Sequence, residues 1–278
     1  MTIKQSFKKS SLAENTNIIF FVVLLIWWMV LFFGFDTQLE KQNLYWAASY
    51  QLIAIWGVIW GIFASKKWGG LKSVMGKSIA FFTTGLFLQV FGQSSFSFYN
   101  LILKVEIPYP SIPDIGYFGS IPFFILGGIY LGKAAGVQFS LNSFFNKIQV
   151  VAIPAFMVAL SYIFFLRDYS FSEISPLQIF LDFGYPIGQA FYISIAILVY
   201  LLSKNFLGGI MKYKVLLILF GLVMQYISDY NFLFQNLKGT WINGGYGDVL
   251  YMFTYFLMTY GLIKIANVFR DESKEKII

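Results

Sequence analysis

The stretch Asn17–Phe35, NIIFFVVLLIWWMVLFFGF, carries no charged side chain and decides the class of the fold. A helix needs about 20 mostly apolar residues to cross a bilayer, and backbone polar groups in hydrocarbon must be satisfied within the segment. The chain of 278 residues is 58% hydrophobic and 12% charged, whereas about a quarter of the residues in soluble domains are charged. The stretch therefore predicts a membrane-spanning helix. No small-residue cleavage site follows it, so we expect an uncleaved first span and not a signal peptide.

Further apolar runs of similar length follow along the chain. They are Leu44–Ala64, Ser78–Phe98, Ile115–Leu131, Ile148–Leu166, Leu177–Leu202, Val215–Phe234 and Leu250–Ala266. Together with the first run they predict an all-α integral membrane protein of eight transmembrane helices. We expect one membrane domain over residues 1–278, in which residues 269–278 form a short cytoplasmic tail.

The placement of basic residues predicts the orientation. Of the 20 lysines and arginines, all but Lys41, Lys104, Arg167 and Lys238 fall on the side of the N-terminus. Because basic loops are retained in the cytoplasm, both termini of this multi-pass protein are predicted to be cytoplasmic, in the plasma membrane. Most acids fall on the opposite side, which makes the outer face net negative. The net charge of +7 is thus explained by the orientation of the chain in the membrane and by contact with the head groups of the lipid bilayer, its expected partner. No nucleic-acid partner is expected.

Two segments of the chain resemble each other. LFLQVFGQSSFSFYNL at Leu86–Leu101 aligns with LVMQYISDYNFLFQNL at Leu222–Leu237. The aligned polar pairs are Gln89 with Gln225, Gln93 with Asp229, Asp114 with Asp248, and Tyr117 with Tyr251. They predict an internal repeat of residues 1–133 and 146–268, two parallel four-helix halves, because an even number of spans gives both halves one orientation. Chance similarity between apolar helices stays open as the alternative.

The composition excludes several chemistries. The chain contains no cysteine and no histidine, so it cannot supply thiolate or imidazole metal ligands, a histidine ligand for haem, or a Ser-His or Cys-His catalytic pair. We expect no cofactor and no metal, and we assign no catalytic residue. Whether the protein is an enzyme stays open, with a non-catalytic role favoured.

The candidate ligand-binding residues are the polar groups toward the outer half of the bundle. Asp229 lies within the seventh span, where an ionisable residue is costly and points to a functional site. Asp114 and Asp248 each open a helix after a proline- or glycine-rich loop, and Ser111 with Asp114 resembles a capping box. Gln93 and Gln189 add polar groups within spans. For each, a purely structural role such as interhelical hydrogen bonding or helix capping stays open.

One loop and two later motifs resemble a known family. PYPSIPDIGYFGSIPFFI, residues 108–125, resembles the PFPSxAD loop of the membrane-embedded sensory region found N-terminal to bacterial GGDEF-type diguanylate cyclases. Tyr185-Pro186-Ile187-Gly188-Gln189 is similar to the YPxGD element of that family, although glutamine replaces its aspartate. Asp229, then GTWINGGYG and Asp248-Val-Leu-Tyr251, match a third element. The resemblance implies that Tyr185 and Tyr251 belong to the site with Asp229 and Asp248.

The resemblance implies ligand-dependent control of a cytoplasmic output. No output domain is recognisable within the 278 residues, so we expect a standalone sensor-like, ligand-binding membrane protein. It would bind an unknown small ligand on the outer side and signal to a separate cytoplasmic protein, and a homodimer is left open. The alternatives are an intramembrane lipid hydrolase of the lysoplasmalogenase type, suggested by YGDVLYM at residues 246–252, or a small-solute transporter.

Overall fold

The computed structural model describes residues 11–34, 40–137, 141–171, 174–203 and 211–268. The eight predicted spans are confirmed, within these ranges, as eight helical segments that are long and apolar enough to cross a membrane. The helices are α1 (Leu12–Phe33), α2 (Glu40–Ser49), α3 (Gln51–Lys67), α4 (Val74–Phe98), α5 (Ile112–Ala134), α7 (Phe144–Ser161), α8 (Pro176–Ser203), α9 (Lys212–Leu237) and α10 (Tyr246–Ala266). The second span consists of α2 and α3, which meet at Tyr50.

Single π-helical turns lengthen two of these helices, Tyr99–Leu103 after α4 and Tyr162–Leu166 after α7. The fourth and eighth spans begin earlier in the structure than the sequence predicted, at Ile112 and Tyr246. The backbone N–H of Ser111 donates to Asp114 Oδ2 at 2.7 Å, which forms the predicted capping box at the start of α5. The carboxylate of Asp114 therefore has a capping role.

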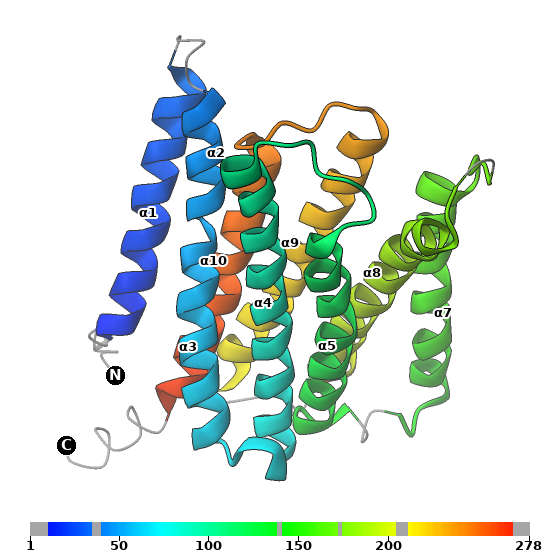
Figure 1. Cartoon of the computed structure of the whole chain (residues 1–278). Coiled ribbons are helices and arrows are strands. Elements are labelled where there is room, and N and C mark those ends of the chain that lie inside the picture. The colour runs from blue at the N-terminus through cyan, green and yellow to red at the C-terminus, as the bar shows by residue number, and fades with distance from the viewer. Residues whose placement is uncertain (1–10, 35–39, 138–140, 172–173, 204–210, 269–278) are drawn as a thin grey trace.

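Six helices form a closed circuit of neighbours. In order around the bundle, α3 packs on α4, α4 on α5, α5 on α8, α8 on α9, α9 on α10, and α10 on α3 again (Figure 1). Helices α1 and α7 lie outside this circuit, against α10 and α8 respectively. In the most apolar stretch of each helix, only 17% of the residues of α1 and 11% of those of α7 are buried, against 61% for α10. Helix α10 is thus the most enclosed element of the bundle.

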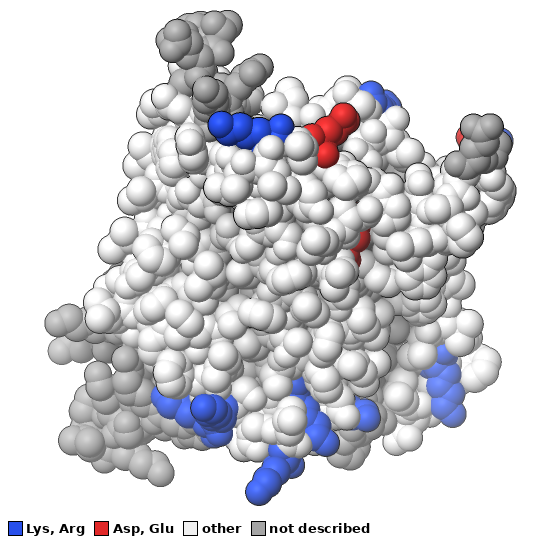
Figure 2. Space-filling model, in the orientation of Figure 1, with Lys and Arg blue, Asp and Glu red and all other residues white. Residues whose placement is uncertain are grey.

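The charges gather at the two ends of the bundle. Figure 2 shows lysine and arginine atoms along the end at which, in Figure 1, α1 begins and α10 ends, and a band almost free of charge above it. A few basic and acidic side chains lie at the opposite end, which we call the distal end. A charge-free band between two charged ends is the arrangement that a membrane-spanning bundle requires.

Helices α4 and α5 approach each other closely through glycine. A Cβ atom built on Gly116 would lie 2.5 Å from the carbonyl oxygen of Leu88 and 2.5 Å from the backbone nitrogen of Gly92. Backbone atoms cannot move aside as a flexible side chain can, so any side chain here forces the two helices apart. One turn further along α5, a Cβ atom on Gly119 would make an ordinary contact of 3.7 Å with the Leu88 side chain.

This difference predicts opposite results for two single-methyl substitutions on one helix. We expect Gly116→Ala to destabilise the protein by about 1–3 kcal/mol, the usual range for overpacking. Gly119→Ala is expected to leave stability unchanged or to raise it slightly, because alanine is favoured over glycine in a helix. Thermal unfolding of both variants in detergent measures this, and equal stability of the two would contradict the close approach.

Candidate functional site

Asp229 lies inside the bundle, held by donors from its own helix and two neighbours. Its Oδ2 accepts a hydrogen bond from the Tyr192 hydroxyl of α8 at 2.6 Å. Its Oδ1 accepts from the Tyr251 hydroxyl of α10 and the Gln225 amide of α9, each at 2.9 Å. The side chain is only 9% exposed. Burial of a carboxylate is costly unless its oxygens are hydrogen-bonded, and these three donors provide that compensation.

Asp248 makes a second buried carboxylate site, at the start of α10. Its Oδ1 accepts from the Tyr50 hydroxyl at 2.8 Å, and its Oδ2 accepts from the backbone N–H of Gly244 at 2.7 Å. Tyr50 is itself buried at the junction of α2 and α3, with its ring 5.8 Å from that of Tyr255. Asp248 therefore joins the loop before α10 to the second span.

Two further residues of the predicted site, Asp114 and Tyr185, are in direct contact. The Tyr185 hydroxyl of α8 donates to Asp114 Oδ1 at 2.8 Å. One turn earlier on α8, Asp182 accepts hydrogen bonds from Tyr109 at 2.8 Å and Tyr169 at 2.7 Å. Two loops at the distal end are thus tied to α8 by tyrosine–aspartate hydrogen bonds.

The two predicted glutamines have different environments. Gln93 accepts from the Tyr117 hydroxyl at 2.7 Å and donates to the carbonyl of Ala47 at 2.9 Å. Gln189 is buried in α8, and its Oε1 finds no hydrogen-bond partner in the part of the chain that the structure describes. A buried acceptor without a partner is uncommon.

Further polar residues that the sequence analysis did not assign to the site form hydrogen bonds nearby. The Tyr255 hydroxyl donates to Gln89 Oε1 at 3.2 Å, and Gln89 Nε2 donates to Ser120 at 2.8 Å. A tyrosine within a span, at the same depth as a carboxylate or an amide of another span, is the sequence signal that could have revealed these residues. Aromatic residues are common throughout this chain, which hid the signal.

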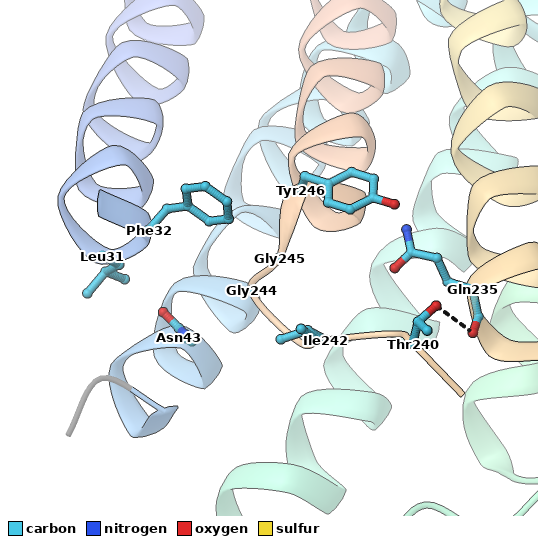
Figure 3. Close-up of a pocket in the computed structure, with 9 residues that line it drawn as sticks. All are labelled: Leu31, Phe32, Asn43, Gln235, Thr240, Ile242, Gly244, Gly245 and Tyr246. Carbon is cyan, nitrogen blue, oxygen red and sulfur yellow. Dashed lines mark hydrogen bonds between the residues drawn. The ribbon is translucent and has the colours of Figure 1, made fainter. Parts of the chain in front are cut away.

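A cavity of about 250 Å³ opens at the distal end, beside the loop that leads into α10. Its lining residues are Leu31, Phe32, Asn43, Gln235, Thr240, Ile242, Gly244, Gly245 and Tyr246 (Figure 3). In Figure 3 the Tyr246 hydroxyl and the Gln235 side-chain amide point toward one another. Gln235 is 6% exposed, and its Nε2 donates to Asn231 Oδ1 at 2.9 Å. The cavity thus combines apolar walls with a few polar groups, as small-molecule sites do.

Gly244 connects this cavity to the buried carboxylate of Asp248. Its N–H donates to Asp248, and its carbonyl accepts from Trp28 Nε1 of α1 at 2.9 Å. Its φ of +76° and a built Cβ only 2.8 Å from the Asn43 Cβ both require glycine. Of the seven predicted ligand-binding residues, none lines the cavity, and Asp248 lies one hydrogen bond from its wall.

The architecture defines the class: the described part of the chain is all-helical, with eight helical segments able to cross a membrane. Comparison with protein-family models gives no match, and comparisons with curated proteins and with solved structures give none either. The resemblance to the sensory region of diguanylate cyclases therefore stays a prediction. Among the described residues, no three acidic side chains come together as a metal site would require.

The hydrogen bond between Tyr192 and Asp229 predicts that removal of one tyrosine hydroxyl lowers the stability of the protein. We expect Tyr192→Phe to destabilise the protein by about 1–3 kcal/mol, because Asp229 then loses a donor within a buried site. Tyr162→Phe is the matched control, since that ring is 54% exposed. Thermal unfolding in detergent compares the two variants. A Tyr192→Phe protein as stable as the control would mean that the hydrogen bond to Asp229 does not hold α8 against α9.

The tyrosines on Asp182 predict an alkaline transition. Burial and the hydrogen bond to Asp182 raise the pKa of Tyr169 to about 12, and the same two causes raise the pKa of Tyr109. Since the unfolded phenol has a pKa of about 10, the stabilisation from these hydroxyls is present below about pH 10 and is progressively lost as the pH rises above 10, for Tyr169 up to about pH 12. We expect the stability difference between wild type and Tyr109→Phe/Tyr169→Phe to be largest near pH 8 and to shrink above pH 10. A difference that is constant from pH 8 to pH 11 in thermal unfolding would contradict this.

Proposed function

We propose that this protein is a sensor-like, ligand-binding protein of the plasma membrane with cytoplasmic termini. It binds a small ligand on the outer side, in the cavity beside Gly244, and signals to a separate cytoplasmic protein. The observation that supports this most is the hydrogen bond from Gly244, in the cavity wall, to the buried carboxylate of Asp248. A molecule that moves this wall also moves the first turn of α10.

The lining of the cavity favours a ligand with hydrogen-bond donors and an apolar part. The Gln235 and Asn43 amide oxygens can accept from hydroxyl or ammonium groups, and the described residues that line the cavity are all uncharged. The rings of Phe32 and Tyr246 provide apolar faces, which also favour a cationic group. A small amine or a polyhydroxylated molecule fits this combination.

Helix α10 supplies a physical connection from the cavity to the opposite end of the bundle. Its first turn carries Asp248, and its last turn carries Lys264, whose Nζ donates to Glu14 Oε2 at 2.8 Å. Asn267, just after α10, donates to the Ser11 hydroxyl at 3.0 Å. A ligand that binds one position of α10 better than another would shift the population of two states. The end beside both termini would then report the shift to the partner.

The proposed internal repeat is supported by matching contacts in the two halves. Tyr117 bonds Gln93 between α5 and α4, and the aligned residues Tyr251 and Asp229 make the same contact between α10 and α9. The fourth span packs on the sixth, as the eighth packs on the second. Such exchange of neighbours is expected of two similar halves related by an approximate two-fold axis.

The alternative functions have less support from these contacts. A lipid hydrolase would need a carboxylate free to act on water or substrate. Asp229 and Asp248 are 9% and 4% exposed, and both oxygens of each accept hydrogen bonds from the protein. A transporter would expose a site near mid-membrane to both sides, whereas this cavity opens at the distal end.

A ligand screen with matched variants tests the proposal. The purified protein is screened by thermal shift with small amines, quaternary ammonium compounds and sugar alcohols. A compound present at about 100 times its dissociation constant should stabilise the folded state by about 2.7 kcal/mol. Gln235→Leu should weaken binding of that compound by roughly three- to tenfold, the value of one hydrogen bond.

Gln42→Leu is the control, because Gln42 is exposed beside Asn43 and does not line the cavity. A compound that stabilises Gln235→Leu and wild type equally would place its site elsewhere and overturn the assignment of the cavity. Stabilisation of wild type that is lost in Gln235→Leu and kept in Gln42→Leu would support it.

A further inference from the structure

Two lysines from neighbouring helices converge on one tyrosine at the basic end of the bundle. The Nζ atom of Lys77, in α4, lies 5.5 Å from the centre of the Tyr130 ring. The Nζ atom of Lys133, in the last turn of α5, lies 5.1 Å from the same centre. Both ammonium groups are therefore gathered around one ring at the seam between α4 and α5.

Neither lysine is explained by an ion pair, because the ion pair found among the described residues joins Lys264 to Glu14 and involves neither of them. Lys133 is favoured by the negative end of the dipole of α5. Lys77 is not, because it follows the start of α4 by one turn, where a helix favours anions, and that first turn carries no acid. Within the part of the chain that the structure describes, no acidic side chain pairs with either ammonium group or lies in the first turn of α4.

An aromatic strip continues from the lysines along the membrane-facing seam. The Tyr130 ring stacks on Phe81 with centroids 5.5 Å apart, and Phe81 contacts Phe123 at 6.2 Å. Phe81 lies one turn into the span from Lys77, and Phe123 lies about two turns into the span from Tyr130. All three rings are half-buried, so each presents part of its surface outward. The order from the end inward is cationic, then aromatic and apolar.

We propose that this seam binds one anionic phospholipid, whose phosphate lies between Lys77 and Lys133 and whose acyl chain lies along Tyr130, Phe81 and Phe123. The charge complementarity selects an anionic head group, because basic pockets between helices on the cytoplasmic side bind such groups. The apolar strip selects a lipid over a free anion, since a soluble phosphate would leave the rings unused. The site is independent of the distal cavity and of the function proposed for it.

The test measures lipid binding by the full chain in detergent, by native mass spectrometry and thermal shift. The probes are phosphatidylglycerol, phosphatidylcholine and inorganic phosphate. We expect wild type to bind phosphatidylglycerol in preference to phosphatidylcholine and to be stabilised by it. Lys77→Gln/Lys133→Gln should weaken that binding by roughly 10- to 30-fold, because each lysine near the surface contributes a several-fold factor.

Lys66→Gln/Lys147→Gln is the matched control, because it removes the same charge from exposed lysines at the same end. This control should bind phosphatidylglycerol as wild type does, and Tyr130→Leu should bind it more weakly although its charge is unchanged. Equal losses in the two double variants would show general attraction to a basic surface and overturn the site. Equal stabilisation by inorganic phosphate, or no preference over phosphatidylcholine, would overturn the assignment to an anionic lipid.

Discussion

A polar group buried away from water must find its hydrogen-bond partners within the protein, and this constraint determines how the buried polar residues of the chain are arranged. Asp229 and Asp248 are accommodated because tyrosine hydroxyls, an amide and a backbone N–H donate to them. Because most of these donors come from other segments of the chain, each carboxylate fixes the relative positions of at least two spans. The buried carboxylates, which are costly to remove from water, therefore specify which helices are neighbours.

Helix α10 has the central place in this arrangement. It is the most enclosed span, and its two ends are attached in different ways. At the distal end Asp248 holds the loop of Gly244 and the cavity wall, and at the other end Lys264 and Asn267 hold the start of α1. The proposed function depends on this arrangement, because a ligand can act across the bundle only through an element that contacts both ends.

None of the seven residues predicted from the sequence lines the cavity, although several of them are hydrogen-bonded to one another, and the parts of the site that were missed have a common cause. Asp114 with Tyr185, and Asp229 with Tyr251, were placed in one site and do form hydrogen-bonded pairs. Tyr192, Tyr50 and the cavity beside Gly244 were not foreseen. Tyr50 and Asp248 are 198 residues apart in the chain, and no local pattern reveals a pairing that depends on how eight helices pack. Gln189 was foreseen as interior and is buried, but its Oε1 has no described partner.

The sequence by itself determined the number of spans, their approximate bounds and the capping box before α5, because span length, hydrophobicity and capping are local properties of the chain. Only the tertiary structure decided the circuit of six helices, the outer positions of α1 and α7, and the partners of each carboxylate. In a membrane, almost any apolar surface can face lipid or another helix at similar cost. Hydrophobicity therefore shows that a helix spans, whereas small residues and hydrogen bonds, which act between distant segments, decide what it packs against.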